Sequence, residues 1–422
     1  MHHLIFPNPG HFHAALTLRK PDPRLSNDLY VYAEGGAELE AFLTLVNAFN
    51  TRAVNPTAWV PHVYTGPDWF PRIISERKGD IAILAGKNDQ KMKHARALHD
   101  AGFHVLADKP WVIDTAGLAD LKAAMAGPPL VMDIMTERHE VTLVMLRALL
   151  ASPEIFGRFA PLEDSPALEV ETTHQLYKTV NGQVLVRYPW YFDIRVQGDG
   201  VVDIPTHLVD QVQWLMGETA FEYDRDVELQ WAKRWNTDLD AGAFERITRV
   251  KPFPEALRSQ VHNGVLRYPC NGAIGFRLRG VPVRVQSEWG LTTTPTADSY
   301  RMVCRGTQAD IVLEHGAHAD SGRRLEVTPR GANAPAVFAA LKAQIAQWQR
   351  EYPGTRLRHT SGAGEIQVPA PLLIGHEEHF ALVLETFLGY LERGVWPESL
   401  ASNILTKYTL LAEASRRATP GP

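Results

Sequence analysis

The feature that most restricts the fold is the alternation of short apolar runs with helical segments over residues 1–130. In the intervening segments apolar residues recur every three or four positions, as in amphipathic helices. Strands joined by helices run parallel, and uninterrupted apolar runs are typical of strands buried on both faces. The pattern therefore predicts an α/β, Rossmann-like, doubly wound parallel sheet. The expected strands are residues 4–6, 29–32, 81–84, 104–107 and 131–135, the expected helices are 12–19, 37–50, 68–77, 90–101, 115–125 and 140–150, and 51–67 is expected to be a loop.

After Gly127-Pro128-Pro129 the hydrophobic period changes to two, which is typical of strands with one buried face. Dipeptides such as Asn181-Gly182 and Arg279-Gly280 predict turns between antiparallel strands. We therefore expect an α+β C-terminal domain with a large, mostly antiparallel sheet. Its expected strands are residues 168–172, 184–186, 227–231, 274–278, 281–285, 311–313 and 325–327, its expected helices are 206–215, 377–393 and 399–417, and 353–370 is expected to be loop.

Charge and cysteine content narrow the class of protein. The net charge is −5 without a long basic run, which argues against nucleic acid or an anionic membrane as a partner. Only Cys270 and Cys304 occur in 422 residues, which favours a reducing compartment and leaves a single disulfide open. The first strand begins without a secretory leader, and no apolar run approaches the roughly 18 residues that span a bilayer. We expect a cytoplasmic protein.

The turn Asp108-Lys109-Pro110 follows the predicted strand 104–107. It places a lysine at the carboxyl end of a parallel strand, where open α/β sheets bind their ligands. Pro110 restricts the backbone of the preceding lysine and holds the turn rigid. The alternative is an ordinary exposed lysine in a loop, which is where most lysines lie.

A second candidate site opens the predicted helix 206–215. Asp203 and His207 are four residues apart, so both side chains can face one direction as the helix begins. Asp210 lies one turn further on and could orient the imidazole of His207. A histidine paired with a carboxylate transfers protons near neutral pH. The alternative is that Asp203 only caps the helix and His207 is a half-buried structural histidine.

Together these two motifs resemble the glucose–fructose oxidoreductase/inositol dehydrogenase (Gfo/Idh/MocA) family. That family carries an E-K-P turn after its fifth strand and a D-x-x-x-H pair opening a helix, which Asp108-Lys109-Pro110 and Asp203…His207 match. Residues 83–88 resemble its A-T-P-N segment, with Asn88 kept and the threonine and proline absent. The chain is most similar to a divergent subgroup with an enlarged C-terminal domain, described no further than as oxidoreductases. The resemblance implies domains at 1–133 (Rossmann-like, dinucleotide-binding), 134–395 (substrate and oligomerisation) and 396–422 (a helix packing back on the first domain).

The resemblance implies an NAD-dependent oxidoreductase that transfers hydride between nicotinamide and a hydroxyl of a sugar, polyol or glycoside. The expected catalytic residues are Lys109, His207 and Asp203. His207 would be the acid/base at the reacting hydroxyl, Lys109 would hold that hydroxyl and polarise the developing carbonyl, and Asp203 would bind a neighbouring hydroxyl or position His207.

The expected phosphate loop is unusual, because the turn after the first strand reads Pro7-Asn8-Pro9-Gly10-His11-Phe12-His13. Aligned on His13, which matches a histidine common in the family, Gly10 takes the third glycine position of G-x-G-x-x-G and Pro7 the second, where an amide donor is lost. The amides at the helix start still favour a phosphate. Glu34 favours NAD over NADP, because a carboxylate binds a ribose 2′-hydroxyl and repels a 2′-phosphate. The expected cofactor-binding residues are Pro9, Gly10, His11, Phe12, His13, Glu34, Ala85, Gly86, Asn88, Asp108, Lys109 and Pro110.

Aromatic and polar residues precede the D-x-x-x-H helix and suit the mixed faces of a sugar. Packing of these aromatic rings beneath the sheet is an equally good alternative. We also expect a homo-oligomer through the exposed face of the C-terminal sheet. The expected substrate-binding residues are His174, Lys178, Tyr188, Trp190, Tyr191, Asp193 and Arg195.

Three other hypotheses stay open. The enzyme could run a redox-neutral reaction, such as glycoside cleavage through transient oxidation with NAD kept bound. A metal site could draw on His11, His13, Asp203 and His207, but no clear ligand set emerges and no metal is predicted. Finally, the protein could be a non-catalytic sugar-binding protein that has lost its cofactor.

Overall fold

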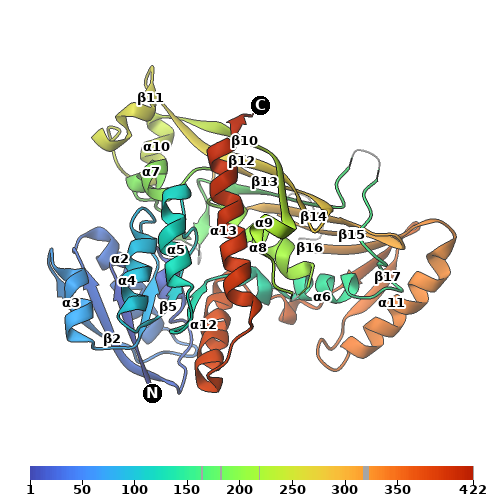
Figure 1. Ribbon diagram of the computed structural model, residues 1–422, viewed down its shortest axis with the longest axis horizontal. Coiled ribbons are helices and arrows are strands. Elements are labelled where there is room, and N and C mark those ends of the chain that lie inside the picture. The colour runs from blue at the N-terminus through green and yellow to red at the C-terminus, as the bar shows by residue number, and fades with distance from the viewer. Residues whose placement is uncertain (163–164, 181–182, 218, 317–322, 422) are drawn as a thin grey trace.

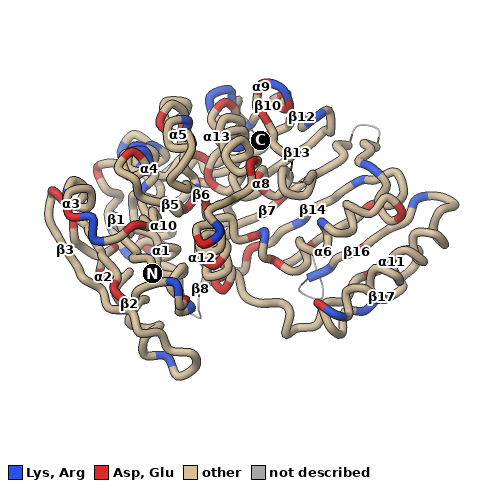
Figure 2. Tube along the Cα trace, turned by 60° about the horizontal axis from the view of Figure 1, so that its bottom comes forward, with Lys and Arg blue, Asp and Glu red and all other residues tan. Residues whose placement is uncertain are grey.

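The computed structural model describes residues 1–162, 165–180, 183–217, 219–316 and 323–421. The chain forms two large sheets that lie side by side, with the helix α13 (Ser399–Arg417) between them (Figure 1). Basic and acidic residues are interspersed over both parts (Figure 2). Within the described residues no helix is both long enough and apolar enough to cross a membrane.

The N-terminal sheet is parallel and has the strand order β3-β2-β1-β4-β5-β6. This is the order of a doubly wound dinucleotide fold, in which ligands bind at the carboxyl ends of the strands where the order reverses, here between β1 and β4. The predicted fold class is confirmed. The strands are β1 (His2–Pro7), β2 (Leu25–Ala33), β3 (Val60–Thr65), β4 (Ile81–Leu84), β5 (His104–Ala107) and β6 (Val131–Asp133), and the helices are α1 (His13–Leu16), α2 (Ala37–Thr51), α3 (Trp69–Glu76), α4 (Lys91–Asp100) and α5 (Leu118–Ala124), the last preceded by the 3-10 turn η1 (Thr115–Gly117).

Two expectations for this part were wrong. Residues 60–65 form the edge strand β3 instead of loop. Proline is tolerated on an edge strand because its missing N–H can face outward, so Pro61 does not interrupt β3. The predicted helix 12–19 is reduced to the four-residue α1, because the chain leaves the helix after Leu16 through turns in which the amides of Leu18 and Arg19 donate to Ala15 and Leu16.

The C-terminal sheet has eleven strands in the order β17-β18-β16-β15-β14-β7-β13-β12-β10-β19, with β11 paired to β12. The pairs β7–β13 and β10–β19 are parallel and the others antiparallel, which confirms the mostly antiparallel sheet. The strands are β7 (Leu168–Gln175), β10 (Val227–Asp240), β11 (Val261–His262), β12 (Val265–Leu278), β13 (Val281–Gly290), β14 (Ser299–Arg305), β15 (Ala309–His315), β16 (Arg323–Pro329), β17 (Arg356–His359), β18 (Gly364–Gln367) and β19 (Thr419–Pro420), beside the separate pair β8 (Thr179–Val180) and β9 (Gln183–Val184).

The segment 353–370 was expected to be loop, but it contains β17 and β18, which extend the sheet: β18 pairs with β16, and β17 pairs with β18. The predicted strand at 184–186 is only β9, and the predicted turn Asn181-Gly182 lies outside the described residues. Cys270 and Cys304 are both buried and free, so they form no disulfide.

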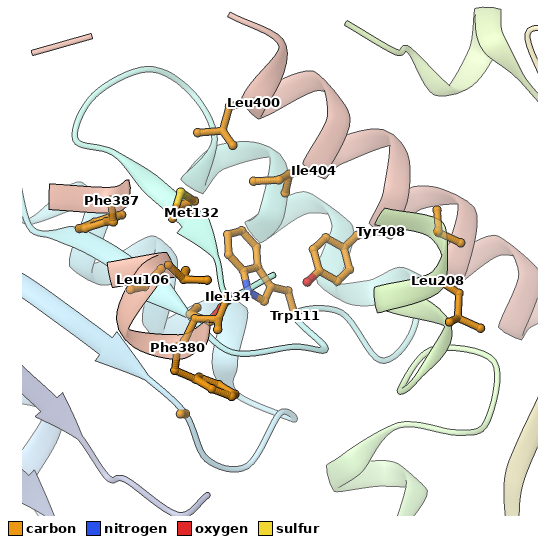
Figure 3. Close-up of a cluster of buried hydrophobic side chains, with 14 of the residues drawn as sticks. Leu106, Trp111, Met132, Ile134, Leu208, Phe380, Phe387, Leu400, Ile404 and Tyr408 are labelled. Atoms are coloured by element: carbon orange, nitrogen blue, oxygen red, sulfur yellow. Dashed lines mark hydrogen bonds between the residues drawn. The ribbon is translucent and has the colours of Figure 1, made fainter. Parts of the chain in front are cut away.

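Helices that follow the N-terminal sheet in the chain cover one face of the C-terminal sheet and reach the first sheet. α6 (Val141–Leu150), α8 (Pro205–Leu215) and α13 contact one another or the strands beneath them, and α13 also contacts α5. Trp111, from the loop after β5, stacks on Tyr408 of α13 with ring centroids 5.4 Å apart (Figure 3). The remaining helices and 3-10 turns are η2 (Thr136–His139), η3 (Pro189–Phe192), α7 (Ile194–Gln197), α9 (Tyr223–Asp226), α10 (Ala241–Thr248), η4 (Glu255–Gln260), η6 (Gly331–Asn333), α11 (Ala334–Trp348), η7 (Ala370–Leu372) and α12 (His376–Arg393).

Candidate active site

Lys109 and Asp203 are 94 residues apart in sequence and form a buried ion pair. The Lys109 Nζ donates to Asp203 Oδ1 at 2.6 Å, and the hydroxyl of Tyr191 donates to the other carboxylate oxygen at 3.3 Å. Burial opposes ionisation of Asp203, but the neighbouring Lys109 ammonium outweighs this and lowers its pKa. The carboxylate therefore stays ionised and holds the ammonium in place.

Asp203 does not cap α8. The N-cap of this helix is Ile204, without a side-chain cap hydrogen bond, and Pro205 is its first residue. The carboxylate instead turns toward the loop after β5, where Lys109 lies. The capping alternative for Asp203 was therefore wrong.

His207 lies on the first turn of α8 and lines the same cavity as Lys109. Burial, followed by the charge of Lys109, lowers the pKa of His207 to about 3, while the charge of Glu137 acts in the opposite direction. Its Nδ1 is buried and has no hydrogen-bond partner among the described residues. The imidazole is therefore neutral near pH 7, with Glu137 as the carboxylate that favours its protonated form.

Asp210 does not orient His207, contrary to the expectation. Arg138 donates to its two oxygens at 2.8 and 2.7 Å, and the ammonium of Lys407 donates at 2.7 Å. The partly exposed Arg138 and the buried Lys407 thus hold the carboxylate on the side of α8 that packs against α13 and η2.

Lys109 and His207 line a cavity of about 410 Å³ between the two sheets. On the side of the cavity formed by the C-terminal domain, Lys178 Nζ donates to Asp298 Oδ2 at 2.5 Å. His174 Nε2 lies 3.9 Å from the same oxygen. Burial lowers the pKa of His174 to about 4. The lining includes His11, Phe12, His13, Lys109, Glu137, His174, Lys178, Arg187, Tyr191, His207, Gln211, Trp289, Asp298, Tyr300, His376 and His379.

Three of the expected substrate residues, His174, Lys178 and Tyr191, line this cavity. Tyr188 and Trp190 instead line a neighbouring cavity of about 490 Å³ beside α2, where the Trp190 indole donates to Glu38 at 2.9 Å. The structure does not bring Asp193 and Arg195 to either cavity: they pair with each other at 2.7 Å, and Asp193 caps α7.

Several residues of the site have no local sequence signal. Arg187 is buried between the rings of Tyr191 and Trp289, 4.8 Å from each centroid. Lys91 is buried under the Asp108-Lys109-Pro110 turn and donates to the carbonyls of Asp108 at 2.7 Å and Pro110 at 3.3 Å, and burial lowers its pKa to about 8. Of these two residues, only Arg187 had a possible signal in the sequence, namely its position next to the aromatic run 188–192.

The loop after β1 is closely packed against the loop after β4. The amides of Gly10 and His11 both donate to the carbonyl of Ala85 at 3.1 Å, and the amide of Asn8 donates to Tyr32 at 2.7 Å. A Cβ on Gly86 would lie 2.9 Å from the carbonyl oxygen of Asn8, so only glycine fits there. Asn88 joins the two domains through its amide group, which donates to the Gln197 carbonyl at 2.9 Å. Pro9 is buried within this loop.

These contacts allow a test of whether a nicotinamide dinucleotide fits. At one end, Glu34 is exposed and lines a pocket of about 240 Å³ with Trp69, Gly86 and His94, in the place of an adenosine ribose. At the other end, Lys109 faces the main cavity. Both ends of the site can therefore hold the matching ends of a dinucleotide. Between them, where the pyrophosphate would lie, the amides of Gly10 and His11 are already hydrogen-bonded to Ala85. A pyrophosphate crossing this span would rely on side chains such as His11 and His13.

Between these ends lies a cluster of His11, His13 and Asp108. The Nδ1 atoms of both imidazoles point at one carboxylate oxygen, Asp108 Oδ2, at 3.4 Å for His11 and 2.9 Å for His13. Burial lowers the pKa of both histidines. Burial opposes ionisation of Asp108 as well, but the His13 and His11 rings outweigh it and hold its pKa far below the usual range.

His379 gives a prediction for acid stability. It is 2% exposed and neither ring nitrogen has a hydrogen-bond partner among the described residues. Burial lowers its pKa to about 4, against about 6.5 in an unfolded chain. As the pH falls from 6.5 to 4, His379 therefore binds a proton in the unfolded state but not in the folded state. This difference lowers the free energy of unfolding by up to about 1.4 kcal/mol per pH unit in this window.

We expect His379→Leu to reduce the loss of unfolding free energy between pH 6.5 and 4. Urea unfolding at several pH values measures it. The exposed His262→Leu variant serves as control and should leave the pH slope unchanged. An unaltered slope in His379→Leu would show that this imidazole titrates alike in both states.

Comparison with known proteins gives the following results. A family model described as "Putative oxidoreductase C terminal domain" matches residues 145–419. The crystal structure of a "putative oxidoreductase" from Parabacteroides merdae is 36% identical, with 99% of this chain and 97% of that chain covered and a TM-score of 0.95. No curated protein matches the sequence.

More distant structures share the fold. GenD2 from gentamicin A biosynthesis, solved with NAD, is 13% identical with a TM-score of 0.59 and 99% and 94% of the two chains covered. KijD10, a 3-ketoreductase from Actinomadura kijaniata solved with NADP and TDP-benzene, is 12% identical with a TM-score of 0.58 and 99% and 98% covered. At this identity the likeness supports the Gfo/Idh-type fold alone.

Proposed function

This chain belongs to the oxidoreductase family defined by that C-terminal domain, and on this premise we propose that it interconverts a hydroxyl and a carbonyl of a sugar-like molecule with a nicotinamide cofactor. The observation that carries the proposal is the buried Lys109–Asp203 pair, which shares one cavity with the neutral His207. A site that only bound a sugar would not need a buried ammonium and a neutral imidazole beside each other.

The roles of the three residues follow from their charges. Neutral His207 can accept the proton of the reacting hydroxyl as a general base. The Lys109 ammonium can donate a hydrogen bond to the same oxygen and stabilise the negative charge that develops on it. Asp203 keeps the ammonium in position through the 2.6 Å contact. Glu137 supports the imidazolium, because its charge raises the pKa of His207.

A nicotinamide bound beside Lys109 would supply the hydride acceptor or donor. Glu34 would bind the ribose at the adenosine end, and Lys109 lies at the nicotinamide end. His11 and His13 would face the phosphates. Because a carboxylate repels a 2′-phosphate, we propose NAD as the preferred cofactor over NADP.

The wall opposite Lys109 supports a substrate rich in hydroxyl groups. It offers charged and polar hydrogen-bonding groups, with Lys178, Asp298 and Arg187 among them, next to the indole of Trp289. Such a mixture of polar groups and one aromatic face is suited to the alternating polar and apolar surfaces of a sugar ring. Which sugar, and which carbon reacts, is open to a substrate screen.

The cofactor choice gives a direct prediction. We expect Glu34→Ala to lower the ratio of NAD to NADP affinity about tenfold or more, since the variant loses both the ribose acceptor and the repulsion of the 2′-phosphate. Calorimetric titration of the purified protein with each cofactor measures this ratio.

Glu40→Ala, an exposed glutamate on α2, is the matched control and should leave the ratio unchanged. If neither NAD nor NADP binds at millimolar concentration, the proposed oxidoreductase function is wrong. If both bind and Glu34→Ala leaves their ratio unchanged, Glu34 is not the selecting residue.

The homo-oligomer through the C-terminal sheet, the cytoplasmic location and the domain limits 1–133, 134–395 and 396–422 also remain proposals. Light scattering of the purified protein tests the first of them. A monomer at micromolar concentration would contradict it.

A further inference from the structure

Two histidines, of which His11 is partly exposed, and one buried carboxylate converge at the edge of the main cavity. One ring nitrogen of His11, one of His13 and a carboxylate oxygen of Asp108 lie within 4.8 Å of one another. The two imidazole rings meet edge to face, with centroids 4.1 Å apart and an interplanar angle of 89°. His11 and His13 line the cavity, so the point between the three groups is reached from the cavity.

A hydrogen bond accounts for only one of the two histidines. His13 Nδ1 lies at hydrogen-bond distance from Asp108 Oδ2, 2.9 Å. His11 Nδ1 points at the same oxygen from 3.4 Å, but it is buried and makes no hydrogen bond among the described residues. An unpartnered buried nitrogen costs roughly 1–3 kcal/mol, so its orientation toward Asp108 calls for a partner between them.

The geometry points to a divalent transition-metal ion of the zinc class as that partner, and we propose that His11, His13 and Asp108 bind one such ion, with an open position facing the cavity. Zinc is bound by imidazole nitrogen and carboxylate oxygen at about 2.0–2.1 Å, so two ligands of a tetrahedral site lie roughly 3.4 Å apart. The separation of 3.4 Å between His11 Nδ1 and Asp108 Oδ2 matches this value, and His13 Nδ1, at 2.9 Å, would exchange its hydrogen bond to Asp108 for the ion. Three protein ligands and an open fourth position are typical of a reactive metal site.

The surrounding charges are compatible with a bound cation. The two ammonium groups nearest to Asp108 are already engaged: Lys91 Nζ donates to the carbonyls of Asp108 and Pro110, and Lys109 Nζ donates to Asp203. Neither donates to the Asp108 carboxylate, which remains available as an anionic ligand. Because Lys91 Nζ holds the backbone carbonyl of Asp108, the carboxylate is already positioned before an ion binds.

A metal ion at this site would also replace the anion-binding amides that the loop 7–13 lacks. The amides of Gly10 and His11 are bound to Ala85 and offer little to an anion. An ion on His11 and His13 places positive charge in this same span, where it can bind an anionic or hydroxyl oxygen of a ligand in the cavity. Binding of the ion itself does not depend on the proposed oxidoreductase function.

The test uses the full chain without a histidine tag, stripped with a chelator and titrated with zinc in a calorimeter. We expect one equivalent bound with a dissociation constant in the micromolar range or below. Replacing zinc with Co²⁺ should produce visible d–d absorption bands, which report on the ligand set directly. His11→Gln should weaken binding at least tenfold, and because His11 Nδ1 makes no hydrogen bond among the described residues this variant should keep its thermal stability.

His62→Gln is the matched control. This exposed histidine also pairs with a carboxylate, Asp28, at 2.7 Å on the edge of the same sheet, but no third ligand joins the pair within the described part of the chain. Zinc affinity should be unchanged in it. His13→Asn is a second variant that should lose the cobalt bands.

Absence of stoichiometric binding, or equal affinity in the native protein and His11→Gln, would overturn the metal site and leave His13–Asp108 as an ordinary hydrogen bond. Titration with NAD in the absence of metal is a separate measurement. Its failure would remove the proposed function without affecting the zinc result.

Discussion

Lys407→Met is expected to lower the free energy of unfolding by about 3–5 kcal/mol, because it removes one partner from a buried ion-pair network. The Lys407 side chain is 1% exposed, and its ammonium donates to Asp133 Oδ2 at 2.6 Å and Asp210 Oδ1 at 2.7 Å. These residues lie on α13, β6 and α8, so the variant weakens the contact of α13 with both domains. Guanidinium unfolding followed by circular dichroism measures the loss.

The exposed Lys342→Met on α11 is the matched control, and its unfolding free energy should change by less than about 0.5 kcal/mol. Asp210 keeps its contacts with Arg138 in the variant, whereas the Asp133 carboxylate keeps, from the residues that the structure describes, the hydroxyl of Tyr408 at 3.3 Å. Adding Asp133→Asn to Lys407→Met should therefore recover part of the stability. A loss below about 1 kcal/mol in Lys407→Met would mean that solvent reaches the network.

Lys109→Met is expected to lower kcat by about 10²–10³-fold, the usual cost of removing one donor to a developing oxyanion. The measurement is turnover of a substrate found by screening, with NAD reduction followed by absorbance. The exposed Lys93→Met on α4 is the control for loss of a surface charge in the same domain and should leave kcat unchanged.

Because Lys109→Met leaves the carboxylate of Asp203 buried and unpaired, a second variant separates catalysis from folding. The double variant Lys109→Met/Asp203→Asn has no unpaired charge and should fold with stability close to native, yet remain as inactive as the single variant. Full turnover in either variant would contradict the role assigned to Lys109. Loss of activity only together with loss of folding would assign the pair a structural role.

The N-terminal fold was predictable because its strands are buried on both faces. β1, β4 and β5 are continuous apolar runs in the sequence, and each appears in the structure within two residues of the expected limits. β3 was missed because it is an edge strand with alternating exposed and half-exposed residues and an internal proline. Its identity comes from pairing with β2, which no local pattern reports.

The candidate site was predictable only in part. Lys109 and Asp203 lie in short motifs whose chemistry is local, and the structure brings them to 2.6 Å. The partner of Asp210 was wrongly predicted, because sequence spacing suggested His207 one turn away, whereas Arg138 and Lys407 arrive from η2 and α13. The site histidines of α12, His376 and His379, carried no motif at all.

The turn 7–13 was likewise predictable only in part. Its prolines and histidines are evident in the sequence and predict an altered phosphate loop. That its amides bind Ala85, and that His11 and His13 point at Asp108, depends on the approach of loops from β4 and β5.

The sequence by itself determined the two sheet types, the positions of most helices and the Lys109–Asp203 chemistry, because periodicity and short motifs act between residues close in the chain. Tertiary structure alone decided the strand order, the cavity wall, the buried network of Lys407 and the cluster of His11, His13 and Asp108. These depend on contacts between residues far apart in sequence, and the energies of such contacts come from burial and charge pairing that form only when the chain is folded.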